Sequence, residues 1–94
     1  MKLQKIASNM YELCEGSKDT FISYSSEVLT IDRDRQVITL HKAWDYSATT
    51  RKQRNKYLHR AGFPEIAAAA DLRKAITAGE FTLRNGLTFA VEMA

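Results

Sequence analysis

The stretch that decides the fold runs from residue 37 to residue 61 and reads VITLHKAWDYSATTRKQRNKYLHRA. Its first part, Val37–Trp44, is rich in β-branched and apolar residues with polar ones between them, which predicts a strand. The period then changes, because Ser47 or Thr49 can cap a helix N-terminus and good helix formers follow. We therefore predict a helix over residues 49–61, directly after a strand.

Outward from this stretch, the chain alternates between strand and helix patterns. Phe21–Ile31 predicts one long strand that pairs with the next strand through the charged loop Asp32–Gln36. Nearer the N-terminus, Met10–Cys14 fits either a strand or a helical turn. Beyond the first helix, Pro64 is placed near the start of a second helix that we predict over residues 65–78.

The C-terminal segment carries a hairpin signal, the pair Asn85-Gly86. A two-residue loop would scatter the apolar residues over both faces of the hairpin. A three-residue loop over residues 84–86 instead sets Leu83 opposite Leu87 and Phe81 opposite Phe89, with the loop glycine in the left-handed conformation. We therefore predict an α+β fold in which an antiparallel sheet of two β-hairpins flanks a pair of α-helices.

Size and composition favour a single soluble domain over residues 1–94. The chain has 94 residues, of which 45% are hydrophobic and 27% charged, as is usual for folded proteins. Its single cysteine, Cys14, excludes an intramolecular disulfide and a cysteine-based zinc cage. We see neither a signal-peptide pattern nor an apolar window of the roughly 18 residues that a membrane span needs. A cytoplasmic protein without membrane partners is the expectation.

The strongest functional signal is the local basicity of the predicted first helix. Residues 51–60 hold five cations and no anion, so a formal net charge of +3 leaves −2 for the rest of the chain. Helical spacing groups Arg54 with Tyr57, Leu58 and Ala61 on an inner face, and it places most of the other cations outside. A local cationic face is suited to phosphate or to an acidic protein. The predicted binding residues are Arg51, Lys52, Arg54, Lys56, His59 and Arg60.

Other polar residues give no comparable signal. Thr49 and Thr50 fit a helix cap better than a nucleophile, since no glycine-rich phosphate loop precedes them. His41 and His59 are too few, and too far from carboxylates in the sequence, to define a metal site. We therefore predict no catalytic residue, no metal and no cofactor, and no enzymatic activity.

Part of the chain resembles a group of small, uncharacterised bacteriophage and prophage proteins. The resemblance runs from Phe21 to Leu58 and rests on Ile22-Ser23-Tyr24, on Lys42-Ala43-Trp44, and on the Ser-x-Thr-Thr-x-Lys pattern of residues 47–52. Two differences are the Ser26-Glu27 pair after the first motif and the Asp45-Tyr46 insertion before Ser47. Small phage proteins of this kind often bind a host enzyme, a defence complex or nucleic acid. The resemblance therefore implies that this chain is also an interaction protein.

Together these patterns favour a non-enzymatic phage or prophage accessory protein in the host cytoplasm. Its expected partner is a host or defence protein with an acidic surface, which it would inhibit, recruit or scaffold. The alternative is sequence-independent nucleic-acid binding through the same basic face. A homodimer is a further alternative, because the terminal hairpin is predicted to leave Val91 and Met93 near a sheet edge.

Overall fold

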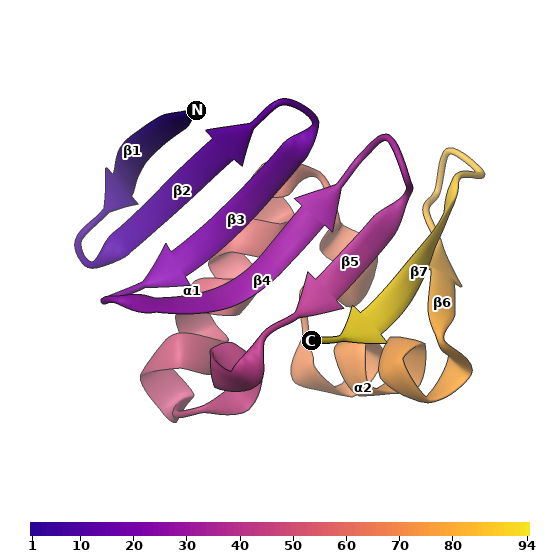
Figure 1. Cartoon of the computed structure of the whole chain (residues 1–94). Helices are drawn as coiled ribbons and strands as arrows, with labels where there is room; N and C mark the ends of the chain where they lie inside the picture. Colours follow the sequence, from indigo (N-terminus) through magenta and orange to yellow (C-terminus); the bar gives the residue numbers. More distant parts are fainter.

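The protein folds into one mixed sheet with two helices, as the computed structural model of all 94 residues shows (Figure 1). The strands lie in the order β1-β2-β3-β4-β5-β7-β6, and both helices lie on the same side of the sheet, behind it in this view. The other side carries no helix. The strands are β1 (Lys2–Ala7), β2 (Met10–Glu15), β3 (Lys18–Ser23), β4 (Ser26–Asp32), β5 (Val37–Leu40), β6 (Glu80–Thr82) and β7 (Thr88–Met93).

The α+β class is confirmed. The predicted sheet of two hairpins has too few strands, because the structure contains one sheet of seven strands. The first five strands form a continuous antiparallel meander before any α-helix begins. The chain then crosses over through the two helices to the edge strand β6 and turns back into β7, which pairs with β5 in parallel. The sheet is therefore mostly antiparallel but mixed. The edge strand of the terminal hairpin is β6, which pairs with residues 88–90 of β7, while β5 pairs with the other side of β7. The homodimer stays a prediction.

The predicted strand over Phe21–Ile31 is two strands. A turn at Tyr24-Ser25 separates β3 from β4, and Ser23 pairs with Ser26 across it. Tyr24 takes a φ of 58°, in the left-handed region that glycine or asparagine usually fills. The sequence contains no such residue here, so its pattern gave no sign of the turn. Met10–Cys14, left open between strand and helical turn, belongs to β2.

The change from strand to helix occurs earlier than predicted. β5 ends at Leu40, and Lys42–Asp45 form a 3₁₀ turn, η1, in place of the last residues of the expected strand. Helix α1 (Ala48–Ala61) follows, and Gly62 ends it with a φ of 95°. The predicted helix over residues 49–61 is confirmed.

The second predicted helix is divided in two. A 3₁₀ turn, η2 (Pro64–Ile66), comes first, and α2 (Ala69–Ala78) begins after an extended Ala68. Pro64 starts the first of these pieces, where its fixed φ and missing N–H are harmless. Neither α-helix is long and apolar enough to cross a membrane.

The terminal hairpin matches the prediction in register. Phe81 pairs with Phe89, and the Leu83 amide donates to the Leu87 carbonyl at 2.8 Å. Gly86 has a φ of 94°, so the three-residue loop is confirmed.

The core lies between the sheet and the two helices. The Phe21 and Tyr57 rings stack with centroids 4.6 Å apart, which fixes α1 on β3. Phe63, at the end of α1, meets Phe89 edge-to-face at 5.1 Å, which fixes the helix connection on the terminal hairpin. The other fully buried apolar side chains of this cluster are Val28, Leu29, Ile31, Ile38, Leu40, Leu58, Ile66 and Leu72.

Candidate functional site

Helix α1 carries the predicted basic face, and its start is fixed by a single cap. The Ser47 Oγ accepts a hydrogen bond from the Thr50 amide at 3.2 Å, and it lies 3.1 Å from the Thr50 hydroxyl. Ser47, not Thr49, is therefore the N-cap. The inner face of the helix buries Thr50, Arg54, Tyr57 and Leu58.

Four of the six predicted binding residues form an exposed row along α1. Lys52, Lys56 and Arg60 follow one another at intervals of four residues, and His59 lies beside Arg60 at the last turn. All four side chains are exposed, and none of them is in an ion pair. We call these four residues the basic stripe.

Arg54 does not belong to the stripe, because its side chain is fully buried. Its Nη1 donates to the Trp44 carbonyl at 2.8 Å, and its Nε and Nη2 donate to the Asn55 Oδ1 at 3.2 and 3.0 Å. The guanidinium also lies 5.6 Å from the centroid of the Trp44 ring. Arg54 therefore joins η1 to α1 and has no surface to offer a partner, which corrects its place in the predicted binding set.

Arg51 is half-exposed and belongs to a cluster around one carboxylate. Asp45 lies 3.6 Å from Arg51, 3.8 Å from Arg54 and 3.0 Å from Arg73 of α2. Burial lowers the pKa of Arg54, while the charge of Asp45 acts in the opposite direction. The cluster neutralises part of the cationic charge of α1 near its start, whereas the stripe residues form no ion pair within the protein.

The charges on the stripe have opposing effects on the helix that carries them. Lys52 and Lys56, and Lys56 and Arg60, are like-charge pairs at i,i+4, each of which costs an isolated helix roughly 0.2–0.5 kcal/mol. His59 and Arg60 lie in the last turn, where a cation favours the helix dipole, but the first turn contains no acidic residue. An acidic partner would relieve the repulsion along the stripe.

A second polar cluster anchors α1 on the sheet. The Tyr57 hydroxyl donates to Glu12 of β2 at 2.6 Å, and the same carboxylate accepts from Gln4 at 2.8 Å and from the Cys14 thiol at 3.5 Å. Burial raises the pKa of Glu12. The hydrogen bonds from Tyr57, Gln4 and Cys14 and the charge of Arg60 together lower it by more than burial raises it, so the net shift is downward. The Glu12 carboxylate thus accepts hydrogen bonds from three side chains, one of which, Tyr57, connects α1 to the sheet.

This cluster contains the only grouping of potential metal ligands, Glu12, Cys14 and Asp19, whose ligand atoms lie within 4.8 Å of one another. Burial, followed by hydrogen bonding and by the charges of Glu12 and Asp19, raises the pKa of Cys14 to about 11. A metal requires the thiolate, so an ion would bind at this group only by displacing the thiol proton.

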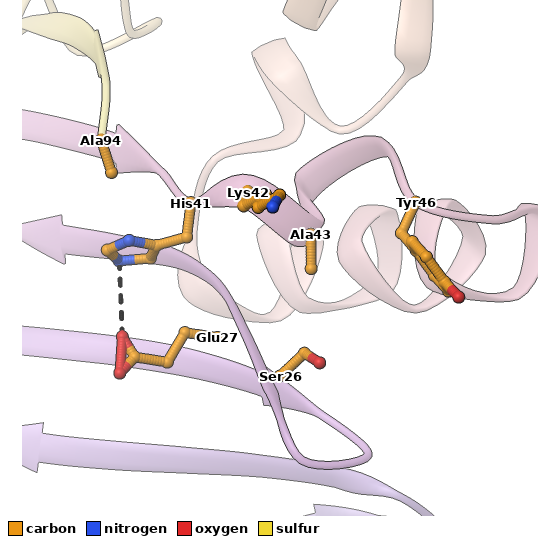
Figure 2. A pocket seen from close by; sticks show the side chains of 7 residues that line it. All are labelled: Ser26, Glu27, His41, Lys42, Ala43, Tyr46 and Ala94. Atoms are coloured by element: carbon orange, nitrogen blue, oxygen red, sulfur yellow. Dashed lines mark ion pairs between the residues drawn. The ribbon is translucent and has the colours of Figure 1, made fainter.

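The structure also contains a surface depression that the sequence did not reveal (Figure 2). It has a volume of about 590 Å³, and Figure 2 shows His41 and Glu27 side by side at one end and Tyr46 at the other. The His41 Nε2 lies 3.9 Å from Glu27 and 2.7 Å from the Thr30 hydroxyl. Both neighbours contact the same nitrogen, whereas a nucleophile activated by a histidine–carboxylate pair needs the two on opposite ring nitrogens.

A narrower hollow opens beside this depression and shares Ser26, Ala43 and Tyr46 with it. Its volume is about 150 Å³, and it lies between the β3–β4 turn, η1 and the start of α1. The motifs on which the sequence resemblance rests supply Ser23, Tyr24, Ala43, Ser47 and Thr50 to its wall. We call it the hydroxyl hollow.

Fold and site together define a small α+β protein with a cationic helix face. The chain matches a family of unknown function, DUF8033, over residues 1–85, and it belongs to that family. The match is longer than the resemblance seen over residues 21–58, and it agrees with the expectation of an uncharacterised family. Comparison with curated proteins and with solved structures gave no match.

Proposed function

We propose that the protein is a non-enzymatic binding protein that docks on an acidic surface of another protein through the basic stripe. The observation that carries the proposal is the exposed row of Lys52, Lys56, His59 and Arg60, none of which forms an ion pair. Such a row gains electrostatic attraction and orientation from a complementary acidic surface. Arg51 lies at the margin of this surface, since Asp45 already holds it.

The shape of the stripe favours a protein partner over nucleic acid. Three fixed charges and one titratable histidine on a convex helix supply few phosphate contacts. From the usual counterion-release slope, three to four contacts would lose about 40- to 150-fold in affinity between 50 and 200 mM salt, well below the loss of a typical DNA-binding protein. Sequence-independent nucleic-acid binding through the same residues is the competing proposal, and salt dependence separates the two.

The biological setting that we propose is the cytoplasm of a bacterial host, where a phage or prophage protein would cover a host or defence protein. The support for this setting is the sequence resemblance carried by residues 22–24, 42–44 and 47–52. Occlusion of an acidic functional surface by a protein of this size would inhibit the partner.

The experiment compares two variants with the same net charge. One reverses Lys52, Lys56 and Arg60 to Glu, and the other reverses Lys5, Lys18 and Lys74, which are exposed on other elements. Each reversal lowers the charge by two, so three reversals take both variants from +3 to −3. We expect saturable binding of a purified acidic partner, identified by affinity capture from bacterial host cells, to be lost in the stripe variant and retained in the other.

The unchanged protein and both variants are also titrated into fluorescently labelled duplex DNA, single-stranded DNA and RNA at 50 and 200 mM salt. Our proposal predicts no binding at the higher salt. Nucleic-acid binding that persists there, and that only the stripe variant loses, would replace the protein-docking proposal by its competitor. Equal loss of partner binding in both variants would show that net charge, and not the stripe, governs association.

A further inference from the structure

The hydroxyl hollow has an unusual chemical lining. Of the seven residues around it, six carry a side-chain hydroxyl. The remaining one is Ala43, so no Asp, Glu, His, Lys or Arg lines the hollow. Each hydroxyl both donates and accepts hydrogen bonds, so the wall can pair with a ligand that does the same. The six are Ser23, Tyr24, Ser26, Tyr46, Ser47 and Thr50.

The polar groups at the floor of the hollow are fixed by their neighbours. Ser23 is 3% exposed, and its hydroxyl donates a hydrogen bond to the Gln53 Oε1 of α1. Thr50 is 6% exposed and is held against the Ser47 hydroxyl. These contacts hold the hydroxyls in place before any ligand arrives, and such preorganisation reduces the cost of binding.

Two tyrosine rings stand at the rim of the hollow. Tyr24 is 56% exposed and Tyr46 is 82% exposed, and neither packs into the hydrophobic core. Large exposed aromatic side chains that line the same depression provide flat apolar contact area next to the hydroxyls.

Tyr24 also occupies a strained backbone position. Its φ of 58° lies in the left-handed region, where a bulky side chain is an outlier and where glycine fits without cost. The Tyr24 amide donates to the Asn9 carbonyl at 2.7 Å, but glycine would keep that bond. The backbone contact therefore does not explain the tyrosine ring, and strain of this kind clusters at ligand sites.

We infer that the hydroxyl hollow binds a neutral sugar. A sugar ring presents hydroxyls around its edge, which match the Ser and Thr hydroxyls, and C–H groups on its faces, which are attracted to the negative faces of aromatic rings. The hollow has a volume of about 150 Å³, below the roughly 300 Å³ at which pockets for drug-sized ligands begin, so its occupant is limited to a single ring. The adjoining depression leaves room for a second ring of an oligosaccharide.

Charge favours a neutral ligand over a phosphorylated one in the hollow. The hollow itself offers no cation, and in the adjoining depression His41 lies against Glu27, which leaves Lys42 as the single cation there without an ion pair. The phosphate of a nucleotide would therefore find no cation within the hollow. This site is independent of the basic stripe, whose exposed side chains do not line it.

The test uses the ¹⁵N-labelled full chain and four disaccharides, maltose, lactose, cellobiose and N,N′-diacetylchitobiose, each titrated to tens of millimolar and followed by amide chemical shifts. We expect at least one to shift the amides of Ser23, Ser47 and Thr50, with a dissociation constant in the millimolar range that is normal for so small a contact. The dinucleotide TpT serves as the phosphorylated comparison.

Three variants locate the site. Tyr24→Gly and Tyr46→Ala should each weaken sugar binding at least tenfold. Gln36→Gly is the matched control, because Gln36 has a φ of 55° but lies outside the hollow. Both glycine variants relieve the same backbone strain, so their thermal unfolding midpoints should equal or exceed that of the unchanged protein, while only Tyr24→Gly loses binding.

Several results would overturn the inference. One is the absence of amide shifts around the hollow with all four sugars. Another is sugar binding that survives both tyrosine substitutions. A fall in the unfolding midpoint with Tyr24→Gly but not with Gln36→Gly would assign the ring a structural role instead. Shifts around the hollow with TpT and not with the sugars would show that the ligand class is wrong.

Discussion

Substitution of the buried Arg54 by alanine should destabilise the protein severely, although the residue lies among the exposed cations of α1 in sequence. The change removes the donors to the Trp44 carbonyl and to Asn55, and it leaves the carboxylate of Asp45 with one cation fewer. Removal of one member of a buried charged network costs about 3–5 kcal/mol. A domain of 94 residues has a free energy of unfolding of roughly 5–14 kcal/mol, so this loss is a large part of the total.

The assay is equilibrium unfolding in urea, followed by far-ultraviolet circular dichroism. Lys56→Ala, two residues away on the exposed face, is the control and should change the free energy of unfolding by less than about 0.5 kcal/mol. Arg54→Lys should fall between the two, with a loss of about 1.5–3 kcal/mol, because an ammonium cannot bond to both acceptors as the planar guanidinium does. A loss below about 1 kcal/mol for Arg54→Ala, or equal losses for Arg54 and Lys56, would refute the argument from burial.

Three further predictions concern the anchor and the cap of α1. Tyr57→Phe should cost about 1–3 kcal/mol by removing the donor to Glu12. Because the folded-state pKa of Glu12 lies below its ordinary 4.5, the stabilisation that its carboxylate provides is present above pH 4.5 and is lost as the pH falls through the lower folded-state value. The free energy of unfolding should therefore fall less steeply with decreasing pH in Tyr57→Phe than in the unchanged protein. An unchanged slope would contradict this. The Cys14 thiol, with a pKa of about 11, should react with iodoacetamide at pH 8 more slowly in the folded protein than in the urea-unfolded chain, by about 10- to 100-fold; equal rates would show that the thiol is not held by the fold. Ser47→Ala should cost about 1 kcal/mol, whereas Thr49→Ala should cost almost nothing, and the reverse order would mean that the cap is misassigned.

Local patterns predicted the elements whose ends depend on one or two residues. The start of α1 follows from a capping hydroxyl, its end from Gly62, and the terminal loop from Asn85-Gly86 and the apolar residues on either side of it. In each of these cases the physical cause lies within a few positions of the element. The turn at Tyr24-Ser25 broke this rule, because tyrosine occupies a position that glycine usually fills.

Long-range pairing was beyond such patterns. The parallel contact of β5 with β7 joins residues 37–40 to residues 90–93, and no short motif encodes it. The hydroxyl hollow is similar, since its wall comes from residues 23, 24, 26, 43, 46, 47 and 50. In the sequence the first three lie within one predicted strand, and the others lie near a predicted strand end and helix cap.

Arg54 shows that the helical spacing carried more information than the charge. Its spacing from Tyr57 and Leu58 placed it on the inner face, and the structure confirms that placement. Its charge placed it in the binding set, and that assignment is wrong. The signal for the buried role was the nearby Trp44-Asp45 pair, which supplies a carbonyl, an aromatic ring and a carboxylate to the guanidinium.

The most direct test of the central claim is site-specific photo-cross-linking on the basic stripe in bacterial host cells. A photoreactive amino acid replaces Lys56 in one protein and Lys74 of α2 in the control, since both positions are exposed. The account predicts a discrete cross-linked protein with an acidic surface from position 56 only, and its loss when Lys52 and Arg60 are also changed to Glu. Identical cross-links from both positions, or cross-links from position 56 to nucleic acid alone, would contradict it.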